Sequence, residues 1–282
     1  MEHLQARTRT GFSAGRTRNS QNADRASLTC PLQTMNRKTP RRIFVGTAGW
    51  SIPRASAHHF DRTGTHLQKY AAILTGAEIN SSFHSSHESR TYSKWASATP
   101  RHFRFAVKLP RTISHDQQLT RVRGPLERFL NESSGLKARR GPLLIQLPPS
   151  LAFERRRIKR FLDTLRALYD GPLVCEPRHE TWFSATASEL LVSYQVARVA
   201  ADPAILEIGK QPGAWNGIVY FRLHGSPRKY WSRYPENYVE VLARTLMEHS
   251  QSADTWCIFD NTASGAAIEN ALELQRRLSS FQ

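Results

Sequence analysis

Side chains that bind anions or transfer protons follow nearly every short apolar run of this sequence. In chain order they are Glu78, Asn80, Lys108, Gln146, Glu176, Arg178, His179, Asp202, Arg222, His224, Asp260 and Asn261. Guanidinium and ammonium groups bind phosphate and carboxylate, and guanidinium does so through two parallel hydrogen bonds. Imidazole and carboxylate groups are common proton carriers near neutral pH. These residue types predict a site that holds a small anion and moves a proton.

Such a site favours an enzyme that acts on a small phosphorylated or carboxylated substrate. The candidates for catalysis are Glu176, His179, His224 and Asp260. The candidates for substrate binding are Trp50, Asn80, Lys108, Gln146, Arg178, Trp182, Arg222, Tyr230 and Asn261. In the second group the cations would hold the anion. The aromatic rings would wall the pocket, as they do in many ligand sites.

The same run ends could instead supply a divalent-metal site. Its ligands would be Glu78, Glu176, Asp202, His224 and Asp260. Carboxylates and imidazole suit Mg²⁺, Mn²⁺ or Zn²⁺, and such a site would favour an isomerase-like or endonuclease-like reaction. Arginines are interleaved with these acids, however, and no short motif with metal-ligand spacing occurs. The sequence therefore assigns no residue to a metal.

The charge balance favours a third class of function. Lys and Arg number 40 against 23 Asp and Glu, which gives a formal net charge of +17. A basic surface attracts nucleic acid as well as anionic metabolites. A non-catalytic, nucleic-acid-associated binding protein is therefore an alternative to the enzyme, although no recognisable nucleic-acid-binding motif occurs. Steep salt dependence of binding would identify it.

Short apolar runs alternate with helical segments from residue 43 onward. The runs are Ile43–Thr47, Ala77–Asn80, Phe103–Lys108, Pro142–Leu147, Pro172–Glu176, Val196–Ala201, Ile218–Leu223 and Trp256–Asn261. Most are continuously apolar, as expected for parallel strands that are covered by helices. The clearest helix spans 154–168, where Ile158, Phe161, Leu162, Leu165 and Leu168 form one stripe. Eight such strand–helix units predict an α/β fold of the (β/α)₈ TIM-barrel type.

The sixth unit is the irregular part of this pattern. Residues 203–217 are rich in Gly and Pro and show no helical stripe after the sixth run. We therefore expect a barrel that is irregular at this unit. An open, doubly wound sheet is the alternative fold.

The composition of residues 1–40 predicts a disordered basic extension, which precedes a single barrel domain over 41–282. An alternative hypothesis is that translation starts at Met35, because the segment before it has almost no periodic apolar positions. No apolar run approaches the ~20 residues of a membrane span, and no signal-peptide stretch occurs at the N-terminus. Cys30, Cys175 and Cys257 lack the spacing of a zinc or redox site. A soluble cytoplasmic protein without membrane contact is expected.

Strand parity predicts which side chains share the barrel interior. Residues two apart on a strand point to the same face, which pairs Glu78 with Asn80 and Arg222 with His224. The same rule would direct Arg104 and Arg198 inward, one layer below the strand ends. Buried arginines need partners, and Glu78 and Glu176 are the expected ones. Part of the predicted site would then be a structural ion-pair network.

Seven motifs together resemble the YecE-like family, also known as domain of unknown function 72. They are VGTAGW at 45–50, EINSSFH at 78–84, FAVKLPRTISH at 105–115, LLIQLPPSL at 143–151, EPRHETWF at 176–183, FRLHGSP at 221–227 and FDNTASGAAIENAL at 259–272. The resemblance runs from about residue 43 to the C-terminus and implies a (β/α)₈-type fold. It implies no activity or catalytic residue. Residues 83–84 read Phe-His, where the family pattern has Phe-Tyr.

Overall fold

A parallel β-barrel carries most of the polar residues singled out above. The computed structural model describes residues 41–281, which belong to one compact unit. The predicted extension over 1–40, the alternative start at Met35 and Cys30 all lie outside the described residues. The strands are β1 (Ile43–Thr47), β2 (Gly76–Ile79), β3 (Arg104–Lys108), β4 (Arg140–Gln146), β5 (Leu173–Glu176), β6 (Val196–Arg198), β7 (Ala200–Asp202), β8 (Gly213–Ala214), β9 (Ile218–Leu223) and β10 (Asp254–Phe259).

Two strand series together complete the barrel. One runs β2-β3-β4-β5-β6 and the other runs β1-β10-β9-β7, and all of these neighbours are parallel. The two series meet on one side at Val199, which separates β6 from β7. On the other side a parallel bridge joins Ala48 to Glu78. The predicted TIM-type fold is therefore confirmed.

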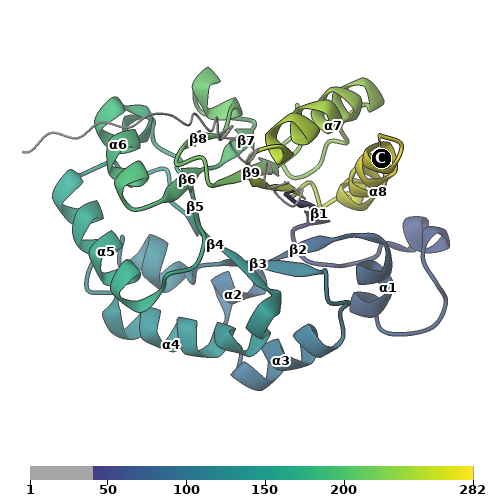
Figure 1. Cartoon of the computed structure of the whole chain (residues 1–282), viewed down its shortest axis with the longest axis horizontal. Helices are drawn as coiled ribbons and strands as arrows, with labels where there is room; N and C mark the ends of the chain where they lie inside the picture. The colour runs from purple at the N-terminus through teal and green to yellow at the C-terminus, as the bar shows by residue number, and fades with distance from the viewer. Residues whose placement is uncertain (1–40, 282) are drawn as a thin grey trace, which may run out of the picture. The chain divides into compact units, whose positions relative to one another are not determined.

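Helices lie around the strands (Figure 1). They are α1 (His66–Ile73), α2 (Ser81–His84), α3 (Ser89–Ser97), α4 (Arg123–Ser133), α5 (Arg155–Leu168), α6 (Ala185–Ser193), α7 (Glu236–Ser250) and α8 (Ala266–Ser279). The predicted stripe on α5 is buried at Ile158, Phe161, Leu162 and Leu165. The Glu154 carboxylate caps this helix by accepting from the backbone N–H groups of Arg156 and Arg157.

The sixth strand–helix unit lacks a regular helix. Between β7 and β9 the chain forms only a short 3₁₀ turn, η5 (Glu207–Lys210), and β8. Strand β8 pairs antiparallel with β6, opposite to the direction of the barrel strands. The irregularity expected for 203–217 is therefore found, because this Gly- and Pro-rich segment has no apolar stripe that could cover the sheet as a helix.

The barrel interior holds an apolar layer below the polar residues that end the strands. Its buried residues are Phe44, Ala106, Leu144, Val174, Ala197, Val199, Ile218, Tyr220, Trp256 and Ile258. The Trp256 ring reaches from β10 towards β4 on the opposite side of the barrel. A Cβ atom at Gly141 would lie 2.7 Å from this ring, so glycine makes room for the indole. A polar layer follows along the same faces of the strands.

Arg198 was expected to point into the barrel, but it points outward. Its neighbours Ala197 and Val199 occupy the interior, so the side chain of Arg198 lies on the opposite face. There its Nη2 donates to the Ile208 carbonyl at 3.2 Å, and its guanidinium lies 5.1 Å from the centre of the Phe183 ring. This arginine thus holds the irregular segment against the outside of the barrel.

Candidate active site

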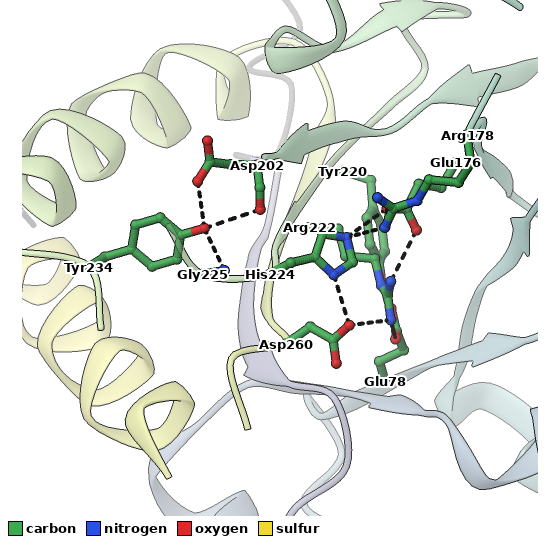
Figure 2. A network of polar contacts seen from close by, with 10 residues as sticks. All are labelled: Glu78, Glu176, Arg178, Asp202, Tyr220, Arg222, His224, Gly225, Tyr234 and Asp260. Carbon is green, nitrogen blue, oxygen red and sulfur yellow. Dashed lines mark hydrogen bonds and ion pairs between the residues drawn. The ribbon is translucent and has the colours of Figure 1, made fainter. Parts of the chain in front are cut away.

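Arg222 is the centre of a buried ion-pair network at the carboxyl end of the barrel (Figure 2). Its side chain is 1% exposed. Nη2 donates to Glu78 Oε1 at 2.8 Å and Nε to Glu78 Oε2 at 3.0 Å, a bidentate pair. Nη1 donates to Glu176 Oε2 at 3.0 Å, and Nη2 also lies 3.0 Å from Asp260 Oδ2. One guanidinium therefore joins three carboxylates from three different strand ends.

This arrangement corrects the expected partners of the buried acids. Glu78 and Glu176 were expected to pair with Arg104 and Arg198, but both bind Arg222. Arg104 instead donates to the carbonyls of Arg101 and Phe103. The physical reason is depth, because Arg104 begins β3 at the amino end of the barrel, whereas both acids lie towards the carboxyl end.

His224 lies beside Arg222 and is fully buried between two acids. Its Nδ1 is 2.9 Å from Asp260 Oδ2, and its Nε2 is 2.7 Å from Glu176 Oε1. Arg178 Nη2 also lies 2.6 Å from Nε2. A carboxylate can only accept and a guanidinium can only donate. Nε2 therefore donates to Glu176 when it carries a proton and accepts from Arg178 when it does not.

Electrostatics keep Glu176 and Asp260 ionised. Burial by itself raises the pKa of Glu176, but Arg222, Arg178 and His224 outweigh burial and hold this pKa well below its ordinary value. Burial likewise raises the pKa of Asp260, and Arg222 and His224 lower it overall. The same carboxylates raise the pKa of Arg222 well above its ordinary value, although burial opposes this. The network is therefore charged at neutral pH.

Tyr220 belongs to the network, although the sequence did not single it out. Its hydroxyl donates to Glu78 Oε2 at 2.8 Å. Burial first, and then the negative charge of Glu78, raise the pKa of Tyr220 well above its ordinary value, so the phenol keeps its proton. Strand parity could have found this residue, since Tyr220 precedes Arg222 by two positions on β9.

Lys108 ends β3 on the same interior face and is 8% exposed. Its Nζ lies 4.0 Å from the centre of the Phe83 ring, over its face. Within residues 41–281 no carboxylate oxygen lies within ion-pair distance of this Nζ. Burial first, and then Arg222, lower the pKa of Lys108 to about 8, against the opposing effect of the three carboxylates.

Tyr230 and Lys229 lie at the rim above the network. Tyr230 is 42% exposed, and its ring meets the His224 ring edge-on with centroids 5.5 Å apart. Lys229 Nζ lies 5.1 Å from the centre of the Tyr230 ring. Burial and the positive charge of Arg178 lower the pKa of Lys229, which places this lysine in the field of the network. It was not among the predicted site residues.

Asn80 and Gln146 extend the interior faces that carry Glu78 and Leu144. Both are partly buried. The Asn80 Oδ1 atom is buried and has no hydrogen-bond partner in the described part of the chain. Buried polar atoms are usually satisfied, so this acceptor is available to a ligand.

Four other predicted site residues make contacts that serve the fold instead, and Trp182 and His179 are the first two. Trp182 is buried and donates from Nε1 to the Leu151 carbonyl at 2.8 Å. His179 Nδ1 accepts from the Thr181 backbone N–H and caps the short turn Glu180–Phe183. Each side chain therefore has a role in folding, and neither is among the contacts of the network.

Trp50 and Asn261 are the other two. The Trp50 ring packs edge-on against Trp95 and Phe105, at centroid distances of 5.1 and 5.8 Å. Asn261 donates from Nδ2 to the Ser232 carbonyl at 2.8 Å and to Asn270 Oδ1 at 3.0 Å. These contacts position the loops after β1 and β10.

Four of the five residues proposed as metal ligands, Glu78, Glu176, His224 and Asp260, lie together, but they bind Arg222 or one another, and Asp202 lies apart. Asp202 accepts from the Tyr234 hydroxyl at 2.7 Å, and Figure 2 shows this pair apart from the cluster around Arg222. Arg222 itself lies between Glu78 and Glu176. In residues 41–281 no group of three His, Cys, Asp or Glu side chains is arranged to hold a metal ion. Across the same residues, no helix has the length and apolar character that crossing a membrane requires.

Comparison with known proteins gives relatives over most of the chain. The model of the family "Protein of unknown function DUF72" matches residues 44–282. The UPF0759 protein YecE of Escherichia coli (strain K12) is 28% identical over 167 residues, which cover 58% of this chain and 59% of YecE. The chain therefore aligns with little more than half the length of YecE. The UPF0759 protein YunF of Bacillus subtilis is 23% identical over 82% of this chain and 93% of YunF.

Solved structures of the same family have this fold. A DUF72 family protein from Enterococcus faecalis superposes with a TM-score of 0.72 and 21% identity, over 84% of this chain and 95% of that one. A DUF72 family protein from Thermotoga maritima gives 0.70 and 24%, over 85% and 100%. The chain thus belongs to the DUF72 family of YecE-like barrel proteins.

Proposed function

We propose that this protein is an enzyme that binds a small phosphorylated or carboxylated substrate at the carboxyl end of the barrel and transfers a proton through His224. The observation that carries the proposal is the position of the imidazole, held by Asp260 on Nδ1 and in contact with both Glu176 and Arg178 through Nε2. An imidazole oriented by a carboxylate on one nitrogen is well suited to general acid–base catalysis through the other.

The cations have different roles in this proposal. All three nitrogens of Arg222 are occupied by carboxylates, so we assign Arg222 to organising the acids and not to binding substrate. Arg178 is partly exposed and its Nη2 is shared between Glu176 and His224. Its remaining donors can bind an anion, with Lys108 and Lys229 supplying further positive charge.

The substrate would contact a small number of further groups. Asn80 offers an unpaired buried acceptor, Gln146 extends the interior face of β4, and Tyr230 forms part of the rim above His224. We leave Trp50, His179, Trp182 and Asn261 out of the proposed site because their contacts serve the fold. A cytoplasmic location is part of the proposal, and the free thiols of Cys175 and Cys257 suit a reducing compartment.

Thermal unfolding with inorganic phosphate, phosphorylated metabolites and carboxylated metabolites tests this function. A ligand at about 100 times its Kd stabilises the folded state by about 2.7 kcal/mol. We expect a stabilisation that is retained at high salt and is lost in Arg178→Ala. Arg90→Ala, which removes an exposed arginine on α3, should leave it unchanged.

The nucleic-acid alternative is tested in the same experiment. Stabilisation by short oligonucleotides alone, with a steep dependence on salt, would refute the enzyme proposal. Equal loss of phosphate binding in Arg178→Ala and Arg90→Ala would do so as well, because it would indicate a diffuse basic surface and not a defined site.

A further inference from the structure

Lys108 has a position that anion binding does not explain. It ends β3 among the buried charged groups, but its ammonium has no carboxylate partner within residues 41–281. The three neighbouring acids already have partners. Glu78 binds Arg222 and Tyr220, and Asp260 binds Arg222 and His224.

The third acid, Glu176, also has its partners within the network. Glu176 bonds to Arg222, to His224 and to Arg178. The lysine Nζ instead lies over the face of the Phe83 ring, 4.0 Å from its centroid. A buried ammonium that is left without a carboxylate partner pays a desolvation cost that favours the neutral amine. The surroundings of Lys108 thus make its uncharged form more populated than that of an exposed lysine.

Charged groups on several elements act on this amine. Burial and then Arg222 on β9 lower its pKa, and together they outweigh the opposite effect of Glu78, Glu176 and Asp260. His115, in the π-helical turn η2 (Thr112–Asp116), has a pKa that is lowered first by burial and then by the positive charge of Lys108. With a pKa of about 8, roughly a tenth of Lys108 is neutral at pH 7, against about one part in three thousand for an ordinary lysine.

We propose that the Nζ of Lys108 is a nucleophile that condenses with the aldehyde or ketone group of the substrate to form an imine. This inference rests on the proposed function and narrows its substrate class to carbonyl compounds that carry a phosphate or carboxylate. Among residues 41–281 Lys108 is the only buried lysine, and its unpaired Nζ carries the argument, because imine formation requires an uncharged amine.

The reaction balances without a further reagent. The Nζ lone pair attacks the carbonyl carbon, and the C=O π electrons move to oxygen to give a carbinolamine after one N–H proton passes to that oxygen. The second N–H proton then passes to the hydroxyl, the C–O bond breaks, and water leaves as the C=N bond forms. The imine makes a neighbouring C–H bond more acidic, and the proton-transfer pair His224–Asp260 would act there.

Reductive methylation with formaldehyde and cyanoborohydride tests the amine without knowledge of the substrate. Formaldehyde is the smallest carbonyl probe, and peptide mass spectrometry resolves the rate at each lysine. The neutral fraction of Lys108 exceeds that of an ordinary lysine about 300-fold at pH 7. Its weaker basicity costs about 15-fold in nucleophilicity, by analogy with thiols. Lys108 should therefore react about 20-fold faster than the surface residue Lys94, with a rate that reaches its plateau above pH 8.

Anionic carbonyl probes then test the substrate class. Borohydride reduction in the presence of pyruvate or dihydroxyacetone phosphate should attach the probe to Lys108, and Lys108→Arg should abolish this adduct. Lys94→Arg is the matched control and should leave it intact. Reaction of Lys108 no faster than Lys94 would overturn the imine proposal, as would adducts spread evenly over the lysines.

The two proposals fail in different ways. If phosphate stabilisation still depends on Arg178 while Lys108 reacts slowly with formaldehyde, the anion site stands and the imine is refuted. If Lys108 reacts fast and phosphate has no Arg178-dependent effect, the amine is confirmed as a nucleophile and the anion site is refuted.

Discussion

Replacing Arg222 with methionine removes the cation that three buried carboxylates share. Glu78, Glu176 and Asp260 all contact its guanidinium, and methionine fills a similar length without a charge. Breaking a buried pair by removing one partner costs about 3–5 kcal/mol, because the remaining charge is buried without compensation. We expect Arg222→Met to lose at least this amount at pH 7, measured by urea unfolding followed by circular dichroism.

The loss of unfolding free energy in Arg222→Met should become smaller as pH falls. In the wild-type protein, Arg222 helps to hold the pKa values of Glu176 and Asp260 below their ordinary values. Their stabilising contribution is therefore present above the unfolded pKa values of about 4 and is lost as pH falls through the lower folded values. In Arg222→Met the acids are buried without that cation, so their protonation removes uncompensated charge and stabilises the folded variant. The difference in stability should shrink between pH 7 and pH 4.

Two comparisons make this prediction refutable. Arg244→Met removes an exposed arginine that pairs with Glu240 on α7, and it should cost at most about 1 kcal/mol. The double variant Arg222→Met with Glu78→Gln should lose less than the sum of the single losses, since the two groups are in contact. A loss below about 1 kcal/mol for Arg222→Met, or a loss that is equal at pH 7 and pH 4, would refute the assignment of Arg222 as the organising cation.

Two further stability predictions concern the barrel interior. Tyr220→Phe leaves Glu78 without the hydroxyl that donates to Oε2, and hydrogen bonds to charged groups predict a loss of about 1.5–3 kcal/mol in urea unfolding. Gly141→Ala should lower the free energy of unfolding by about 1–3 kcal/mol, because its new Cβ would lie 2.7 Å from the Trp256 ring. In contrast, Gly124→Ala on α4 meets nothing within 4 Å and should be neutral or stabilising in the same assay.

Much of the fold could be predicted because strand and helix periods are local properties of the sequence. The first predicted run, Ile43–Thr47, coincides with β1. The sixth, Val196–Ala201, is divided by Val199 into β6 and β7. That interruption is not visible as a composition change, since apolar residues continue through it. Asp202 pairs with Leu223 and Arg198 with Cys175, both on the outer face of the barrel, so the two residues share a face as parity predicts. The expectation failed because it assumed that Asp202 points into the barrel.

The residue types of the site were predictable, but their pairing was not. Glu176, His224 and Asp260 were candidates because polar groups end the strands of a parallel barrel. Arg222 and Glu78, however, are 144 residues apart in sequence, and no local pattern specifies that a guanidinium on β9 will bind both an acid on β2 and one on β5. Side-chain depth within the barrel decides such pairs, and depth follows from strand register across the closed sheet.

The Trp256 ring has a kinetic consequence for an enzyme built on this barrel. The indole stacks on Phe44 at 4.5 Å and on Tyr220 at 6.0 Å, and it reaches to the backbone of β4 at Gly141. Apolar side chains thus pack across the barrel below the polar layer, and we expect them to block passage to the amino end. Substrate entry and product exit then share the opposite end. Product should accordingly compete with substrate for free enzyme, and the order of release should follow how deeply each product is bound.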